Sequence, residues 1–285
     1  MRQRQSPLTT PTPKSRLSQS AASWQTRHMP IALITGPTSG IGKAFALQLA
    51  ARGLDMVLVA RDVDRLESLA ANLRSRFGVA VEVLTADLTN GADLARVEAR
   101  LRSDDRPVHT LVNNAGFGAG ATFEAATADV IDQMIALHVT AVTRLTHAAL
   151  PGMRARRAGL VLTVASTAGL LPAASSSPYG ATKAYEIALM RGLSGGLAGT
   201  GVRVVAVCPG LTRTEFHERA GLDLSRVPGF LWLSPHRVVS DALRAAARGI
   251  VVSIPTKRYR YALRVAGLLP GAGAAGVVRR MSTRG

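Results

Sequence analysis

The chain has 285 residues, 47% of them hydrophobic, a single cysteine and a formal net charge of +17. This length and composition suffice for one large domain or two small ones, and a single cysteine excludes an intrachain disulfide. The charge raises the possibility of an anionic partner, but the arginines are scattered through helical patterns and no nucleic-acid-binding motif is present, so we expect no nucleic-acid partner.

Residues 1–28 are rich in Ser, Thr, Pro, Gln and Arg and have no hydrophobic period, which predicts a disordered basic tail. Met29 follows directly before the first apolar run, which suggests that the native chain starts there. The N-terminus lacks the apolar core of a signal peptide, and no uninterrupted apolar run reaches the roughly 18 residues of a membrane-spanning helix. We therefore expect a cytoplasmic protein.

Apolar runs alternate with helical patterns from residue 29 to residue 255. The runs typical of buried strands are Ile31–Thr35, Met56–Ala60, Val79–Thr85, His109–Asn113, Leu160–Ala165, Val202–Cys208 and Ile250–Ile254. The helical patterns between them are Ile41–Arg52, Asp64–Phe77, Ala92–Arg102, two helices across Ala125–Arg156, Tyr179–Gly199 and Pro235–Arg248. This alternation predicts an α/β fold, a single doubly wound parallel sheet of about seven strands with helices on both faces. Residues 29–255 then form one domain, and residues 256–285 a basic, helical C-terminal extension.

A glycine-rich turn joins the first predicted strand to the first predicted helix. It reads Thr-Gly-Pro-Thr-Ser-Gly-Ile-Gly from Thr35 to Gly42. Glycines allow the backbone to turn tightly and to approach a pyrophosphate, whose charge the helix N-terminus stabilises. The strand–turn–helix position makes this turn a candidate dinucleotide site, although its T-G-x-x-x-G-x-G spacing differs from the general G-x-G-x-x-G fingerprint.

Ser166, Tyr179 and Lys183 are candidate catalytic residues. Ser177-Pro178 predicts a helix start, so Tyr179 and Lys183, four residues apart, share one helix face. An ammonium beside a phenol favours the phenolate, as does the helix N-terminus, and we expect a lowered pKa for Tyr179 and a role as general acid or base. Ser166 ends the preceding strand, where it can hydrogen-bond an oxygen held by Tyr179. The alternative is a chance Tyr-x-x-x-Lys on an amphipathic helix.

Taken with Asn113-Asn114-Ala115-Gly116 and Pro209-Gly210, these motifs resemble the short-chain dehydrogenase/reductase family. The resemblance extends from about Pro30 to about Val252, with every motif in the family's order. It implies a Rossmann-like fold, a nicotinamide cofactor, and a Ser–Tyr–Lys site that reduces carbonyls or oxidises alcohols. It implies no metal site.

The resemblance also assigns cofactor contacts to residues spread along the chain. Those beside the phosphates are Gly36, Ser39, Gly40, Ile41 and Gly42; those framing the adenine are Asp87 and Leu88; those at the ribose and nicotinamide are Asn114, Ala115, Gly116, Tyr179 and Lys183; and those covering the nicotinamide amide are Pro209, Gly210 and Thr212.

The choice between the two nicotinamide cofactors can be argued from Arg61. This residue follows the second predicted strand, where an acidic residue would accept the ribose 2′-hydroxyl of NAD. An arginine there can pair with the 2′-phosphate of NADP, so we expect NADP(H) to be preferred over NAD(H). The alternative is a surface arginine in the salt bridges of the next helix, where Asp62 is adjacent.

His138 departs from the family pattern, since related enzymes carry an Asn at this position. In the family, the main-chain carbonyl of that residue holds a water that reaches the catalytic Lys. A backbone role survives a change of side chain, so we expect His138 to keep its place in the relay; slower turnover or a redirected role are the alternatives. A histidine side chain could also titrate at about pH 6.5 and add a pH dependence.

Residues 211–233 include Phe216, Phe230 and Trp232, which predict an apolar lid and a hydrophobic carbonyl substrate, such as a 3-oxoacyl or steroid-like ketone. A purely structural role for these aromatic residues is the alternative. The segment after residue 255 loosely resembles the family branch that holds fatty-acyl and steroid ketoreductases. A non-catalytic NAD(P)-binding sensor is the alternative function.

The partners expected are other copies of the chain, because related enzymes often pair through their long helices into homodimers or homotetramers. Lys257, Arg260 and Arg264 share one face of a predicted helix, with Tyr259 and Leu263 on the opposite face. Such a helix can lie on an anionic membrane surface, but we expect its apolar side to pack on the protein instead.

Overall fold

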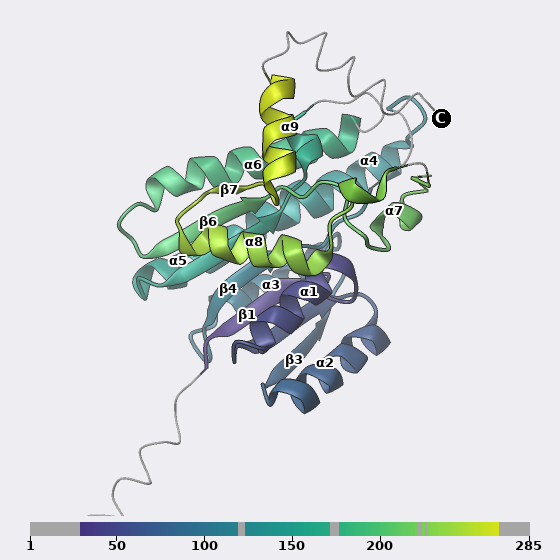
Figure 1. Ribbon diagram of the computed structural model, residues 1–285. Coiled ribbons are helices and arrows are strands. Elements are labelled where there is room, and N and C mark those ends of the chain that lie inside the picture. The colour runs from purple at the N-terminus through teal and green to yellow at the C-terminus, as the bar shows by residue number, and fades with distance from the viewer. Residues whose placement is uncertain (1–28, 119–122, 172–176, 222–223, 226, 268–285) are drawn as a thin grey trace, which may run out of the picture.

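The computed structural model describes residues 29–118, 123–171, 177–221, 224–225 and 227–267. The predicted tail 1–28 and residues 268–285 of the predicted extension lie outside this description. One parallel sheet runs through the molecule in the order β3-β2-β1-β4-β5-β6-β7 (Figure 1). Its strands are β1 (Ile31–Thr35), β2 (Asp55–Ala60), β3 (Val81–Thr85), β4 (Val108–Asn113), β5 (Gly159–Val164), β6 (Val202–Val207) and β7 (Val252–Ser253). The strand order reverses between β1 and β4, and ligands of open α/β sheets bind at such a point.

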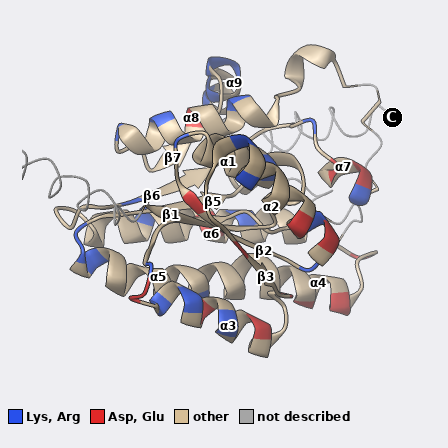
Figure 2. Cartoon of the chain, turned by 90° about the horizontal axis from the view of Figure 1, so that it is seen from below, with Lys and Arg blue, Asp and Glu red and all other residues tan. Residues whose placement is uncertain are grey.

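Helices connect the strands and cover both faces of the sheet. They are α1 (Gly40–Ala50), α2 (Val63–Phe77), α3 (Gly91–Arg102), α4 (Ala128–Ile135), α5 (Val142–Ala155), α6 (Ser177–Gly196), α7 (Phe216–Arg219), α8 (Pro235–Ala247) and α9 (Lys257–Gly267). A π-helical segment, η3 (Ala136–Ala141), joins α4 to α5. Helices α1, α2 and α8 pack on one face and α3, α5 and α6 on the other, each with its own apolar core (Figure 2).

The central strands form where the sequence is mostly apolar, because they are buried on both faces, whereas the edge strand β3 is only partly buried and contains Glu82. All five residues of β1 are buried. Leu33 faces the core beneath α3 and α5, and Ile34 faces the core beneath α1 and α8. The alternation of side chains along one strand thus supplies both cores.

The predicted α/β fold with one doubly wound parallel sheet is confirmed. The segment predicted as Ile250–Ile254 forms only the two-residue strand β7, because it lies at the sheet edge and pairs with β6 at two positions. The two helices expected across Ala125–Arg156 are joined end to end through η3. The short helix α7 was not predicted.

The Lys and Arg residues are distributed over helices on both faces of the sheet, interspersed with Asp and Glu residues (Figure 2). Many take part in ion pairs, such as Arg100 with Glu82 and Arg144 with Glu98. Within the described part of the chain, no helix combines the length and apolar character needed to cross a membrane.

Candidate active site

The turn after β1 is shaped to receive a phosphate. Gly36 and Gly40 have φ angles of 62° and 53°, in the left-handed region that favours glycine. A Cβ added to Gly42 would lie 2.2 Å from the carbonyl oxygen of Gly36. Ser39 is the N-cap of α1, yet its side chain caps none of the helix's first N–H groups, and the first turn holds no acidic residue. These N–H groups and the bare backbone therefore fit an anionic ligand such as a pyrophosphate.

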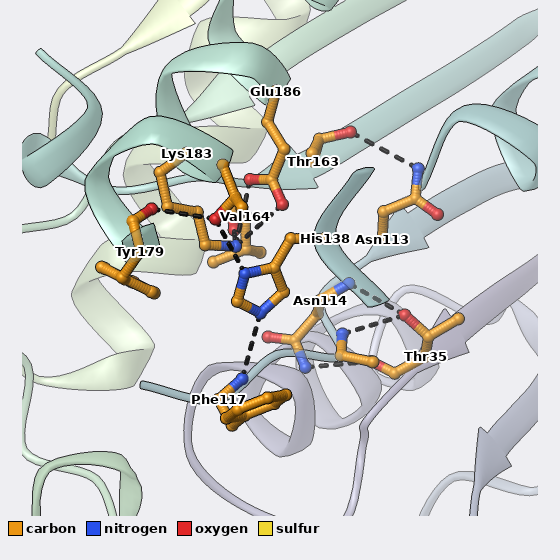
Figure 3. Close-up of polar contacts among 12 residues, drawn as sticks. Thr35, Asn113, Asn114, Phe117, His138, Thr163, Val164, Tyr179, Lys183 and Glu186 are labelled. Carbon is orange, nitrogen blue, oxygen red and sulfur yellow. Dashed lines mark hydrogen bonds and ion pairs between the residues drawn. The ribbon is translucent and has the colours of Figure 1, made fainter. Parts of the chain in front are cut away.

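Thr35 and Asn114 fix this turn against the end of β4 (Figure 3). The Asn114 side chain donates from Nδ2 to the carbonyl oxygens of Thr35 at 2.9 Å and Gly36 at 2.8 Å. In return, the backbone N–H groups of Asn114 and Ala115 donate to Thr35 Oγ1, each at 3.0 Å. Thr35 was not predicted as a functional residue, although it begins the glycine motif. Its hydroxyl joins the ends of the two strands that border the site.

Arg61 and Asp87 mark the end of the site where the resemblance places the adenosine. Arg61 Nη1 lies 3.7 Å from Asp87 Oδ2, and 78% of the Arg61 side chain is exposed. Burial acts to raise the pKa of Asp87, but hydrogen bonds from Thr89 and the Arg61 charge outweigh it and hold that pKa below its ordinary value. Asp62 instead caps α2, where its carboxylate accepts a hydrogen bond from Arg65 N at 3.0 Å. The exposed Arg61 guanidinium therefore remains accessible to an anion.

Lys183 is held in a buried ion pair on α6. Its side chain is 5% exposed, and Nζ lies 5.7 Å from the centre of the Tyr179 ring. The ammonium donates to Glu186 Oε1 at 2.9 Å, to Glu186 Oε2 at 3.0 Å and to the carbonyl oxygen of Val164 at 3.0 Å (Figure 3). Glu186 was not predicted, although its position three residues after Lys183 places the two side chains on one helix face.

Tyr179 has a raised pKa, so the expectation of a lowered one is wrong. Burial raises the pKa most; the charge of Lys183 and a hydrogen bond with Ser166 act to lower it, and the Glu186 carboxylate raises it further. Ser166 Oγ also accepts a hydrogen bond from Ala168 N at 3.1 Å. The structure thus brings Ser166, Tyr179 and Lys183 together as predicted, but it keeps the phenol protonated.

His138 is fully buried within η3. Its Nε2 accepts a hydrogen bond from Phe117 N at 3.1 Å, so the proton of the neutral ring is on Nδ1, which lies 3.0 Å from Thr182 Oγ1. The Thr182 hydroxyl in turn donates to the carbonyl oxygen of Tyr179 at 2.9 Å. Burial, together with the charge of Lys183, places the pKa of His138 well below its ordinary value. The expected titration at about pH 6.5 is therefore wrong, and the ring instead links the turn after β4 to α6.

The segment after β6 lies over the candidate site. The centres of the Phe216 and Tyr179 rings are 5.7 Å apart, whereas Phe230 is 64% exposed. A Cβ added to Gly40 would lie 2.9 Å from Cγ2 of Thr214, which places this segment directly against the glycine turn. Of the predicted lid residues, Phe216 therefore faces Tyr179 and Phe230 faces solvent.

The first turns of α9 hold this covering segment in place. The Tyr259 hydroxyl accepts a hydrogen bond from Leu211 N at 3.1 Å and donates to the carbonyl oxygen of Leu231 at 2.8 Å. A Cβ added to Gly210 would lie 2.0 Å from Cε1 of Tyr259, so only glycine allows this contact. Tyr259 packs on the protein as predicted, while Tyr261 on the opposite side of α9 is 72% exposed.

The remaining predicted cofactor residues lie near the carboxyl ends of the strands, as the glycine turn does. Ile41 lies in the first turn of α1, Leu88 is buried after β3, and Gly116 adjoins His138. In the segment after β6, the carbonyl oxygen of Pro209 accepts a hydrogen bond from Thr167 N at 3.0 Å. Thr212 Oγ1 donates to the carbonyl oxygen of Gly210 at 2.9 Å.

Residues 30–224 match the family model described as short chain dehydrogenase. A short-chain dehydrogenase from Sphingobium yanoikuyae, solved in complex with NADPH, superposes with a TM-score of 0.78 at 42% identity, over 84% of this chain and 92% of that one. A bulky-bulky ketone specific alcohol dehydrogenase from Comamonas testosteroni superposes with a TM-score of 0.73 at 36% identity, over the same shares of the two chains.

Among curated proteins, the very-long-chain 3-oxoacyl-CoA reductase of Anas platyrhynchos is 33% identical over 191 residues. The match covers 65% of this chain and 60% of that protein, which is less than two thirds of its length.

Proposed function

This chain belongs to the short-chain dehydrogenase family of oxidoreductases, and we propose that it uses NADP(H) to interconvert a hydrophobic ketone and its alcohol. The observation that carries the proposal is the convergence of Ser166, Tyr179 and Lys183 beside a glycine turn that fits a pyrophosphate. The bound nicotinamide cofactor would supply the hydride. The residues proposed to hold it are those of the glycine turn, Arg61, Asp87, Leu88, the turn at Asn114–Gly116 and the segment Pro209–Thr212.

Tyr179 is proposed as the group that donates a proton to the carbonyl oxygen. Its raised pKa keeps the hydroxyl protonated at neutral pH, which is the state that reduction requires. The Ser166 hydroxyl, which is hydrogen-bonded to Tyr179 in this structure, would turn to donate its single hydrogen bond to the same substrate oxygen. Lys183 supplies positive charge beside the phenol as the proton leaves, and the carbonyl oxygen of Val164 orients its ammonium.

His138 is proposed to support this reaction through position rather than through titration. Its neutral ring links the backbone of Phe117 to Thr182, and Thr182 links to the backbone of Tyr179. The side chain therefore fixes the phenol relative to the turn after β4. A relay through the main chain of His138 remains part of the proposal.

A preference for NADP(H) is proposed from Arg61. Its exposed guanidinium follows β2, beside Asp87, where a 2′-phosphate can pair with it. The NADPH bound to the Sphingobium yanoikuyae relative supports this assignment.

Replacing Arg61 by aspartate is expected to raise the KM for NADPH by roughly 10- to 100-fold, because a charge-assisted pair becomes a repulsive one. The KM for NADH should stay the same or fall. Arg52→Asp is a matched control, because this exposed arginine precedes β2 and therefore lies at the amino end of the strand, whereas Arg61 follows its carboxyl end. Equal KM values for NADPH in wild type and Arg61→Asp would refute the assignment of Arg61.

A hydrophobic ketone is proposed as the substrate because the Phe216 ring lies beside Tyr179, the proposed proton donor, and supplies an apolar surface there. The two ketone-directed relatives, one for bulky ketones and one for 3-oxoacyl-CoA, support this class. The test is the consumption of NADPH over a panel of simple aldehydes, bulky apolar ketones, steroid ketones and 3-oxoacyl thioesters. Turnover of the apolar ketones above the simple aldehydes is expected. NADPH binding without turnover of any carbonyl would favour the alternative of a dinucleotide sensor.

Assembly into a homodimer or homotetramer is also part of the proposal. The outer surfaces of α5 and of the C-terminal part of α6 form a groove whose lining includes Leu150, Pro151, Leu193 and Leu197 together with the polar His147 and Arg154. Gly192 and Gly196 on α6 have no atom within 4 Å of their Cβ positions, so a second helix can approach closely there.

A further inference from the structure

Glu186 is a buried carboxylate that the reaction proposed above does not use. It lies one turn beyond Lys183 on α6 and is 1% exposed. We propose that Glu186 is a positioning residue, which offsets the charge of Lys183 and thereby keeps the proton on Tyr179, so that the site favours carbonyl reduction over alcohol oxidation. This inference rests on the function proposed for the site.

The hydrogen bonds of Lys183 show how the offset arises. A lysine ammonium has three N–H donors, and here three acceptor atoms surround it: both carboxylate oxygens of Glu186, at 2.9 and 3.0 Å, and the carbonyl oxygen of Val164 at 3.0 Å. Figure 3 shows the ammonium between the Glu186 carboxylate and the His138 ring, with Tyr179 to one side. At 5.7 Å from the Tyr179 ring centre, the ammonium acts on the phenol as half of an ion pair.

The other charged and titratable groups around Glu186 come from three elements. Tyr179 lies on the same helix, and the Glu186 carboxylate raises its pKa. Cys208 follows β6, and its pKa is raised to about 12, first by burial and then by Glu186, so its thiol stays neutral. His138 in η3 is neutral because its pKa lies well below the ordinary value. The Lys183 ammonium is therefore the positive charge that Glu186 balances.

The charge of this ion pair changes near neutral pH. Burial raises the pKa of Glu186 to about 7, although the charge and hydrogen bonds of Lys183 oppose the rise. Above this pH the pair is neutral, and the carboxylate partly offsets the effect of the Lys183 charge on Tyr179. Below it, Glu186 is protonated, and the uncompensated ammonium favours the phenolate. The carboxylate therefore protects the proton of Tyr179 as the pH rises, which extends reduction into the alkaline range.

The test is the pH dependence of ketone reduction and of alcohol oxidation in Glu186→Gln, which keeps the size and hydrogen bonding of the side chain but removes the charge. The pH above which reduction is lost should shift down by about one pH unit, and oxidation should begin at a correspondingly lower pH. Glu98→Gln is the control, because Glu98 on α3 is also a buried carboxylate but is paired with Arg102 and Arg144. Its two pH profiles should match those of the wild type.

The Glu186→Asp variant distinguishes the effect of the carboxylate charge on the pH profiles from the effect of side-chain packing on stability. It keeps the carboxylate, so its pH profiles should stay close to those of the wild type even where its melting temperature falls. A purely structural role for Glu186 would lower kcat in both variants without moving either profile. Unshifted profiles in a folded Glu186→Gln enzyme that binds NADPH would overturn the inference.

The same experiment distinguishes this inference from the proposed function. Wild-type enzyme without turnover of any ketone would contradict the proposed function, whereas wild-type turnover with an unshifted Glu186→Gln profile would contradict the inference alone. If Glu186→Gln does not fold, the protonation state of Glu186 is followed instead by infrared titration of the wild type. The spectrum of Glu186→Asp is the reference that assigns the carboxyl band to Glu186. A Glu186 that is ionised above about pH 7 supports the inference, and a buried carboxylic acid signal that persists throughout the alkaline range overturns it.

Discussion

Tyr179→Phe is expected to lower kcat for ketone reduction by about 10³-fold while leaving the Kd for NADPH unchanged. The substitution removes only the hydroxyl that is proposed to donate the proton. The phenyl ring retains the contacts that the tyrosine ring makes with His138 and Phe216, whose ring centres lie 5.8 and 5.7 Å away. Loss of turnover with intact cofactor binding would therefore report on the proton donor and not on the fold.

Tyr185→Phe is the matched control for this prediction. Tyr185 lies on the same helix, and its hydroxyl hydrogen-bonds to Thr143 Oγ1 at 2.8 Å on the surface of the protein. Removing that hydroxyl should leave kcat within about twofold of the wild type, because exposed hydrogen bonds contribute little. A Tyr179→Phe enzyme with near-normal kcat would show that another group donates the proton.

The second large effect is expected at Gly42, where alanine should weaken NADPH binding by about 100-fold, equivalent to about 2.8 kcal/mol. The added Cβ would lie 2.2 Å from the carbonyl oxygen of Gly36 and 2.4 Å from Nδ2 of Asn114. The first atom belongs to the glycine turn and the second to the side chain that fixes the turn. The clash must therefore displace the backbone that is proposed to receive the pyrophosphate. Calorimetric titration with NADPH measures the loss.

Gly91→Ala controls for the general effect of replacing a glycine near a helix start. Gly91 begins α3, and no atom lies within 4 Å of its Cβ position. This variant should bind NADPH like the wild type, whereas Gly42→Ala should lose affinity and also melt at a lower temperature, because overpacking costs about 1 to 3 kcal/mol. Wild-type affinity in Gly42→Ala would contradict the assignment of the glycine turn to the cofactor.

Much of the fold could be predicted because the central strands are buried on both faces and therefore appear in the sequence as mostly apolar runs. The bounds of β1 were predicted without error, since all five of its residues are buried. The edge strand β7 was overestimated, because its burial depends on one neighbour alone and the sequence does not show which strand lies at the edge.

The residues of the candidate site could be named from their motifs, but their electrostatic state could not. The Tyr179–Lys183 spacing predicts that the two share a helix face, yet the pKa of Tyr179 also depends on burial and on Glu186. The neutral state of His138 depends on hydrogen bonds to residues 21 and 44 positions away in the sequence. The contact between Tyr259 and Leu211 spans 48 positions, so the sequence alone did not reveal that α9 supports the lid.

The central claim is that this site transfers a hydride from a nicotinamide to a carbonyl carbon while Tyr179 protonates the oxygen. The most direct measurement supplies NADPH fully deuterated at C4 together with a bulky apolar ketone, and analyses the alcohol by mass spectrometry. We predict a single deuterium on the carbinol carbon with the wild-type enzyme, and about 10³-fold slower formation of this alcohol with Tyr179→Phe. Alcohol that carries no deuterium, or formation of labelled alcohol at equal rates by the two enzymes, would contradict the account.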